Sequence, residues 1–348
     1  MGKSSRKTKN EIKTQKEGAV MKKKVSRIFL LLSFLLLLVS PTLASEEILI
    51  SQCLEYLKAK DFEKALQVGE MAVKFYPQKS LAYLCLGKAY LGVKDPLSAL
   101  DAAKKAQELA KNARELSLAC NLLGRIYEEL NDLDNALLNY HSELLWLTFL
   151  NEKDNVIWTL IHIASVFEKK GDFDKALENL EKALSLQPEE LQKIYVYGMM
   201  GVVYEKKNDY EKAIDCLKKA IEIGEKHGKH YDLGSLYLFL GESHEETKDY
   251  LNAEKYFLKS LEKARELGDK ELEAYACLKI GTLYLKRGNV QMAESYFVKT
   301  YDLFRAIGNY DKSYEIFFSY RKNSKAKITW RKRKNFCRKG TAYESKKR

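Results

Sequence analysis

The stretch EKKGDFDKALENLEKALSLQP, residues 168–188, decides the fold. A Gly-Asp turn leads into an apolar face on which Ala176 and Ala183 stand seven residues apart, and the stretch ends at Pro188. The turn and its alanine return in AKDFEKAL (59–66), VKDPLSAL (93–100), LNDLDNAL (130–137), KNDYEKAI (207–214), TKDYLNAE (247–254) and RGNVQMAE (287–294). These matches in phase indicate a repeat protein.

A second set of positions keeps the same phase. A small residue lies twelve positions before each alanine, and a ring-bearing residue follows three positions after the small one. Glycine inside a helix costs about 1 kcal/mol relative to alanine, so its recurrence predicts a place where two helices approach closely. The alanines are Ala65, Ala99, Ala136, Ala176, Ala213, Ala253 and Ala293; the small residues are Cys53, Gly87, Gly124, Ala164, Gly201, Gly241 and Gly281; the rings are Tyr56, Tyr90, Tyr127, Phe167, Tyr204, His244 and Tyr284.

This pattern resembles the tetratricopeptide repeat (TPR), over about residues 46–320. The resemblance implies an all-α, right-handed superhelical solenoid of antiparallel helix pairs, with about seven repeats and a partial eighth first helix at 310–323. An Asp precedes six of the seven second helices and suits a turn or N-cap position. Extra residues after the alanines of copies five and six predict longer second helices. Glu143 replaces the second small residue of copy three, which predicts irregular packing there.

The resemblance also implies a partner-binding groove on a concave face formed by the first helices. Carboxylates in its C-terminal half favour a basic, partly apolar protein or peptide partner. The Lys and Asn arrangement with which chaperone-type members hold a peptide's terminal carboxylate does not occur in any copy. The groove residues carried over are Leu84, Lys88, Asn121, Arg125, Trp158, Ile161, Glu168, Tyr195, Glu205, Leu238, Glu242, Glu245, Tyr275 and Leu278.

The positive charge of the chain lies at its ends. The 348 residues carry a formal net charge of +12, yet residues 28–320 sum to a net of −8, because segments 1–27 and 321–348 are strongly basic. The repeat region is therefore not expected to bind nucleic acid. The tail 321–348 is predicted to be disordered, and contact with nucleic acid or anionic lipid is its alternative role.

The N-terminal region resembles an export signal. From Met21, a basic stretch precedes the apolar run 28–40, and Thr42-Leu43-Ala44 suits cleavage before Ser45. Residues 21–44 are thus predicted to be a signal peptide that directs the chain to the periplasm or outside the cell, and 1–20 is a polar basic extension that precedes the expected start at Met21. The alternative is a membrane anchor at 28–40, although this run falls short of the roughly 20 residues that a spanning helix needs.

No pattern of catalytic residues accompanies the repeats. The sequence lacks a phosphate-binding loop, HExxH and GxSxG, and its six cysteines show no metal-ligand spacing. We expect Cys53, Cys85, Cys120, Cys216 and Cys277 to be small buried residues, with no cofactor, metal or small-molecule substrate. The sequence favours a non-enzymatic protein-interaction scaffold of the cell envelope. The alternative is a membrane-anchored or intracellular regulator that acts through its basic tail.

Overall fold

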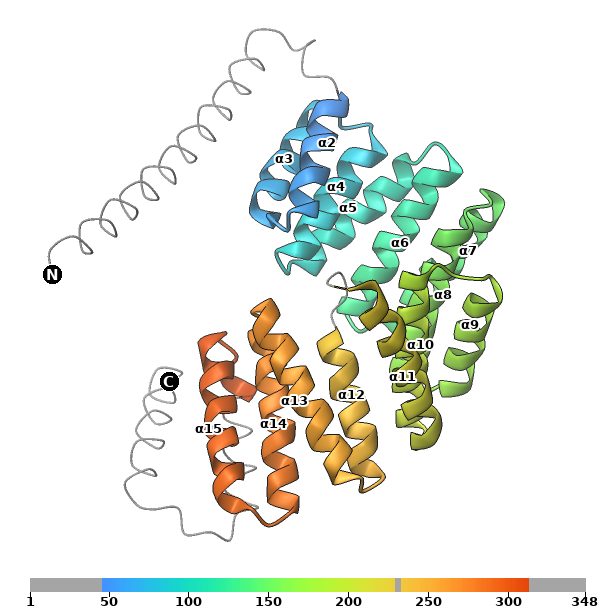
Figure 1. Cartoon of the computed structure of the whole chain (residues 1–348). Helices are drawn as coiled ribbons and strands as arrows, with labels where there is room; N and C mark the ends of the chain where they lie inside the picture. The colour runs from blue at the N-terminus through green and yellow to red at the C-terminus, as the bar shows by residue number, and fades with distance from the viewer. Residues whose placement is uncertain (1–45, 229–232, 313–348) are drawn as a thin grey trace, which may run out of the picture. The chain divides into compact units, whose positions relative to one another are not determined.

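The computed structural model describes residues 46–228 and 233–312, and within those ranges it contains helices and no strand. Figure 1 shows consecutive helices running antiparallel, which confirms the predicted all-α fold of paired helices. The pairs of first and second helices are α2 (Glu46–Lys58) with α3 (Phe62–Phe75), α4 (Ser80–Gly92) with α5 (Pro96–Leu109), α6 (Ala113–Glu129) with α7 (Leu133–Phe149), α8 (Lys153–Lys169) with α9 (Phe173–Ser185), α10 (Glu190–Lys206) with α11 (Tyr210–His227), α12 (Leu233–Glu246) with α13 (Tyr250–Leu267), and α14 (Lys270–Lys286) with α15 (Val290–Ala306).

The pairs fall into two compact units, and each is described by itself. Unit 1 ends at Leu150 and contains α2–α7; unit 2 begins at Asn151 and contains α8–α15. Helices α11 and α13 each have 18 residues against 13 in α9, so the predicted longer second helices are confirmed. We call the side formed by α2, α4 and α6, or by α8, α10, α12 and α14, the first-helix face of its unit.

The turn inside each helix pair has one construction. A residue with positive φ precedes an Asp or Asn, whose side chain accepts a hydrogen bond from a backbone N–H in the first turn of the second helix. The cap satisfies a backbone donor that a helix start leaves without a partner. Glycine supplies the positive φ at Gly171 and Gly288, whereas Lys248 reaches 61° with a side chain.

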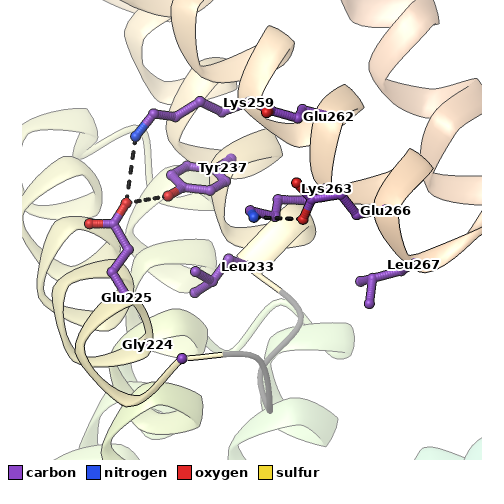
Figure 2. Close-up of a pocket in the computed structure, with 10 residues that line it drawn as sticks. Gly224, Glu225, Leu233, Tyr237, Lys259, Glu262, Lys263, Glu266 and Leu267 are labelled. Atoms are coloured by element: carbon purple, nitrogen blue, oxygen red, sulfur yellow. Dashed lines mark hydrogen bonds and ion pairs between the residues drawn. The ribbon is translucent and has the colours of Figure 1, made fainter.

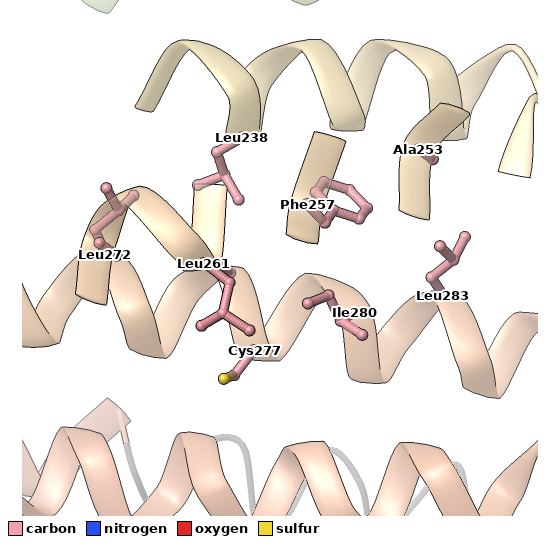
Figure 3. Packing of buried hydrophobic residues seen from close by; sticks show 10 residues of the cluster. Leu238, Ala253, Phe257, Leu261, Leu272, Cys277, Ile280 and Leu283 are labelled. Carbon is pink, nitrogen blue, oxygen red and sulfur yellow. The ribbon is translucent and has the colours of Figure 1, made fainter. Parts of the chain in front are cut away.

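Small residues allow the helices of a pair to pack closely. All seven repeat alanines are fully buried. A Cβ added at Gly241 would lie 2.5 Å from Phe257 Cδ1, and one added at Gly124 would lie 2.6 Å from Tyr140 Cε1. Figure 3 shows Phe257 on α13 beside Ile280 and Leu283, which come from the first helix of the next repeat. Three of the core clusters are shared in this way between one pair and the first helix of the next, so the core is a series of clusters rather than a single one.

Two of the buried cysteines form a disulfide, which the sequence did not predict. Cys53 on α2 and Cys85 on α4 form a disulfide across a sequence separation of 32 residues, with Cα atoms 6.3 Å apart. Both residues are buried, as predicted, but their pairing was not predicted, because the repeat brings the two first helices together and cysteine spacing does not reveal this. Cys120, Cys216 and Cys277 are free and buried, as predicted.

Several sequence predictions fall on segments beyond the described ranges. The signal peptide 21–44, the extension 1–20, the apolar run 28–40 and the tail 321–348 all lie there. The expected eighth helix begins at Tyr310, where 310–312 are helical and Asn309 accepts a hydrogen bond from the Lys312 N–H; its remainder lies outside the description. Among the described helices, none combines the length and apolar character needed to span a bilayer.

Candidate functional site

Ion pairs connect successive first helices of unit 2. Glu168 on α8 pairs with Lys206 on α10, and Glu245 on α12 pairs with Lys286 on α14 at 2.8 Å. Both pairs use the same repeat positions, because each glutamate stands four residues after the small residue of its copy and each lysine stands five after that of the next. Glu168 and Glu245 are buried, so these pairs are part of the joint between repeats.

The joint between α10 and α12 lacks such an ion pair. Glu205 occupies the glutamate position, but Glu246 stands where the other two joints have lysine. Glu205 Oε2 is shielded from solvent and accepts no hydrogen bond from the described residues. Burial, followed by the negative charge of Glu242, raises the pKa of Glu205 to about 8, while Lys279 and Lys206 act in the opposite direction. This carboxylate therefore lacks the cation that its counterparts have.

The neighbouring carboxylate Glu242 is partly exposed and paired. It lies on α12, one residue after Gly241, and forms an ion pair with Lys279 on α14. Its side chain is 15% exposed. Glu205, Glu242 and Glu246 thus bring three acidic groups to the α10–α12 part of the first-helix face, and Lys279 is the cation paired with one of them.

Aromatic side chains extend this face towards α8. The rings of Trp158 and Tyr195, on successive first helices, meet edge to face with centroids 5.0 Å apart. Tyr195 is 53% exposed. Trp158 thus packs against Tyr195, and part of the Tyr195 ring stays open to solvent.

Other predicted groove residues lie inside the repeat packing. Leu84, Ile161 and Leu238 are buried, so they support the first-helix face from beneath. Tyr275 packs its ring against Phe304 at 5.3 Å, and Leu278 is half-buried against the same cluster. A role for these residues in partner binding stays a prediction.

Unit 1 differs from unit 2 in the polar groups of its first-helix face. Asn121 donates a hydrogen bond of 2.9 Å from Nδ2 to Glu143 Oε1, so copy three replaces small-residue packing with a polar contact. Lys88 is half-buried on α4, and Arg125 is exposed on α6. Burial and then the charge of Arg125 lower the pKa of Lys88. The sequence identified these positions but not their electrostatic setting.

A cavity of about 900 Å³ lies where α11, α12 and α13 meet (Figure 2). The Tyr237 hydroxyl donates a hydrogen bond to Glu225, and Lys259 Nζ lies 3.5 Å from the same carboxylate. Figure 2 also shows Lys263 and Glu266 joined to each other. Most of the polar groups that line the cavity therefore interact with one another.

Reactive and metal-binding groups have ordinary surroundings. Burial raises the pKa of the Cys120 and Cys277 thiols to about 11, which suppresses the nucleophilic thiolate. His227 is exposed, 3.9 Å from Glu190, whereas His230 lies outside the described ranges. Within the described residues, no three His, Cys, Asp or Glu side chains gather as metal ligands.

The family comparison agrees with the repeat pattern. Models of the tetratricopeptide repeat match residues 118–140, 155–226 and 232–306. The matched ranges contain every small-residue and alanine position of copies three to seven. They leave out only the last residues of some second helices.

Similar proteins were found by sequence and by structure. The chain is 30% identical over 129 residues to the Protein CTR9 homolog of Arabidopsis thaliana; the match covers 36% of this chain and 12% of that relative. The apo form of the quorum sensor NprR from B. thuringiensis has a TM-score of 0.59 at 15% identity, covering 91% of this chain and 99% of NprR. The Cut9–Hcn1 hetero-tetramer of the APC/C has a TM-score of 0.58 at 15% identity, covering 80% of this chain and 50% of the matched chain. At 15% identity, these two similarities show a shared fold.

Proposed function

We propose that this chain, which carries tandem tetratricopeptide repeats, is a non-catalytic scaffold of the cell envelope that holds a basic protein segment on the first-helix face of unit 2. The repeat array itself supports an interaction role, because TPR arrays generally bind proteins or peptides. A repeat fold does not identify the partner, so its chemistry must come from the side chains of the face.

The absent cation at Glu205 is the observation that carries the proposal. Glu168 and Glu245 each have a lysine from the next repeat, whereas Glu205 faces Glu246 and Glu242. A Lys or Arg side chain of a partner would supply this missing charge and a donor for Oε2. Tyr195 on the same first-helix face would contact apolar atoms of that segment.

The envelope setting rests on two separate features. The pattern of residues 21–44 is that of a signal peptide. The Cys53–Cys85 disulfide suits an oxidising compartment, because cytosolic thiols are kept reduced. Sequencing the N terminus of the mature protein tests this part: a chain beginning at Ser45 supports export, and a chain that retains 28–40 supports the anchored alternative.

A charge substitution tests the partner site. Glu246→Lys would place a lysine where the other joints have one, and Glu222→Lys is a matched control on the exposed surface of α11. Full-length protein and both variants serve as baits in an envelope extract. We expect a basic partner to be captured by the wild type and the control and lost from Glu246→Lys. Equal capture by all three folded baits would refute the proposed site.

A milder variant separates charge from folding. Glu205→Gln keeps the shape of the side chain but cannot become the anion that a partner's cation would pair with, so it should weaken capture without loss of helical content. The exposed Glu211 on α11 provides the corresponding control, Glu211→Gln. If Glu211→Gln weakened capture as much as Glu205→Gln, the partner would not be recognised through the first-helix face.

A further inference from the structure

Two cations of unit 1 lie near each other without a carboxylate partner. Lys88 and Arg125 occupy the same repeat position, one residue after the small residue, on the adjacent first helices α4 and α6. In the described part of the chain, neither side chain forms an ion pair with a carboxylate, and the ammonium of Lys88 is half-buried. Withdrawing a cation from water without a counter-charge opposes folding. A bound anion would offset this cost by supplying the missing negative charge.

The nearest carboxylates of unit 1 are directed at other donors. Glu143 on α7 accepts the hydrogen bond from Asn121, and Glu128 on α6 accepts one of 2.6 Å from the Tyr140 hydroxyl. The charge that acts on Lys88 is the positive one of Arg125. Glu128 and Glu143 therefore do not neutralise the positive charge of Lys88.

Apolar side chains occupy neighbouring helix and repeat positions on the same face as the cation pair. Leu54 on α2 holds the corresponding position in copy one and is 40% exposed. Leu81 on α4 stands seven residues before Lys88, about two helical turns away, and is 38% exposed. Leu91, one turn beyond Lys88, and Leu118 on α6 are half-buried. A ligand that reaches the cations is thus bordered by leucines in several directions.

We propose that the first-helix face of unit 1 binds an amphipathic protein segment, whose internal Asp or Glu side chain contacts Lys88 and Arg125 while its apolar side chains cover Leu54 and Leu81. Leucines on several sides of the pair favour an acid in the interior of a segment over one at a chain end. The inference rests on the proposed function only in treating the chain as a protein-binding scaffold. The site, its charge and its partner chemistry are different from those at Glu205.

Peptide selection tests this inference. Random peptides displayed at the N terminus of a phage coat protein have no free C-terminal carboxylate, so enriched acids must be side chains. Selection on the full-length protein should enrich segments with Asp or Glu between apolar residues. Synthetic versions should bind Lys88→Met/Arg125→Met about tenfold more weakly or worse, because an interfacial charge contact is lost. Binding by Lys104→Met, which removes an exposed lysine on α5, should be unchanged.

Thermal unfolding distinguishes a binding role from a structural one. Removal of an unpaired, half-buried cation should leave the Tm of Lys88→Met equal to or above that of the wild type, while peptide binding falls. Failure to enrich acids, or equal binding of the acidic peptides by the double variant, would overturn the inference. So would a fall in Tm that parallels the loss of binding. The proposed function is judged separately, by capture on Glu246→Lys, which leaves unit 1 unaltered.

Discussion

Substituting Gly241 with alanine tests the close packing between first and second helices. The new Cβ would lie 2.5 Å from Phe257 Cδ1 and 2.6 Å from Cε1, and Phe257 is fully buried. Overpacking of this kind costs about 1–3 kcal/mol, whereas exchanging a helical glycine for alanine gains about 1 kcal/mol. The free energy of unfolding should therefore fall by about 0–2 kcal/mol.

Gly281 provides the matched control. It holds the same repeat position, but its added Cβ would lie 3.2 Å from Phe297, which is 8% exposed. We expect Gly281→Ala to be neutral or to raise the free energy of unfolding by up to about 1 kcal/mol, so Gly241→Ala should be the less stable variant by up to about 3 kcal/mol.

Urea unfolding followed by circular dichroism at fixed redox conditions measures both variants, and the midpoints can be compared if the m-values agree. Equal shifts for the two glycines, or stabilisation by Gly241→Ala, would show that clearance at Phe257 does not limit packing.

Four further outcomes are expected. The pKa of Glu205 is raised from 4.5 to about 8, so between these pH values the folded chain binds more protons than the unfolded chain, and stability falls as the pH rises. Glu205→Gln should flatten this pH dependence of the urea midpoint. An unchanged pH dependence in the variant would contradict the role given to Glu205. Non-reducing peptide mapping should recover Cys53 linked to Cys85, and replacing both with alanine should lower stability by about 3–4 kcal/mol under oxidising conditions. Asp209→Ala should cost about 1 kcal/mol by removing the α11 cap, whereas Asp209→Asn should not. Lys248→Gly should raise the free energy of unfolding by about 1 kcal/mol, because a φ of 61° strains a residue that carries a side chain; a loss of stability would show that the backbone at Lys248 is not strained.

The sequence predicted the fold well because close helix packing restricts residue type. Only a small residue fits at Gly241 opposite Phe257, and only a short polar side chain caps a helix as Asp209 does. Such local requirements recur in phase and can be read from one chain. His244, which departs from the aromatic pattern, still stacks on Tyr256 with centroids 5.4 Å apart, so the ring was the property to follow.

The candidate site was less predictable because exposure and pairing depend on neighbours in other repeats. The repeat position placed Leu84 on the groove, yet the structure buries it under the first-helix face. The missing ion pair of Glu205 reflects Glu246, which stands 41 residues later at the lysine position of the next copy. It becomes visible only when the glutamate and lysine positions of adjacent copies are compared. That comparison was available in the sequence. The proximity of Cys53 to Cys85 was not, since it depends on how α2 lies against α4.

The Cys53–Cys85 bond makes the first described repeat different from the last, because it is held to its neighbour covalently. The end repeat of a solenoid has a neighbour on one side only, so it is ordinarily the first to separate when the chain is heated, pulled or exposed to a protease. Here a covalent link holds the first helix of repeat one to that of repeat two, and tension entering through α2 is passed at once to α4. A segment bound across Leu54 and Lys88 would therefore rest on two helices that cannot part while the bond is intact.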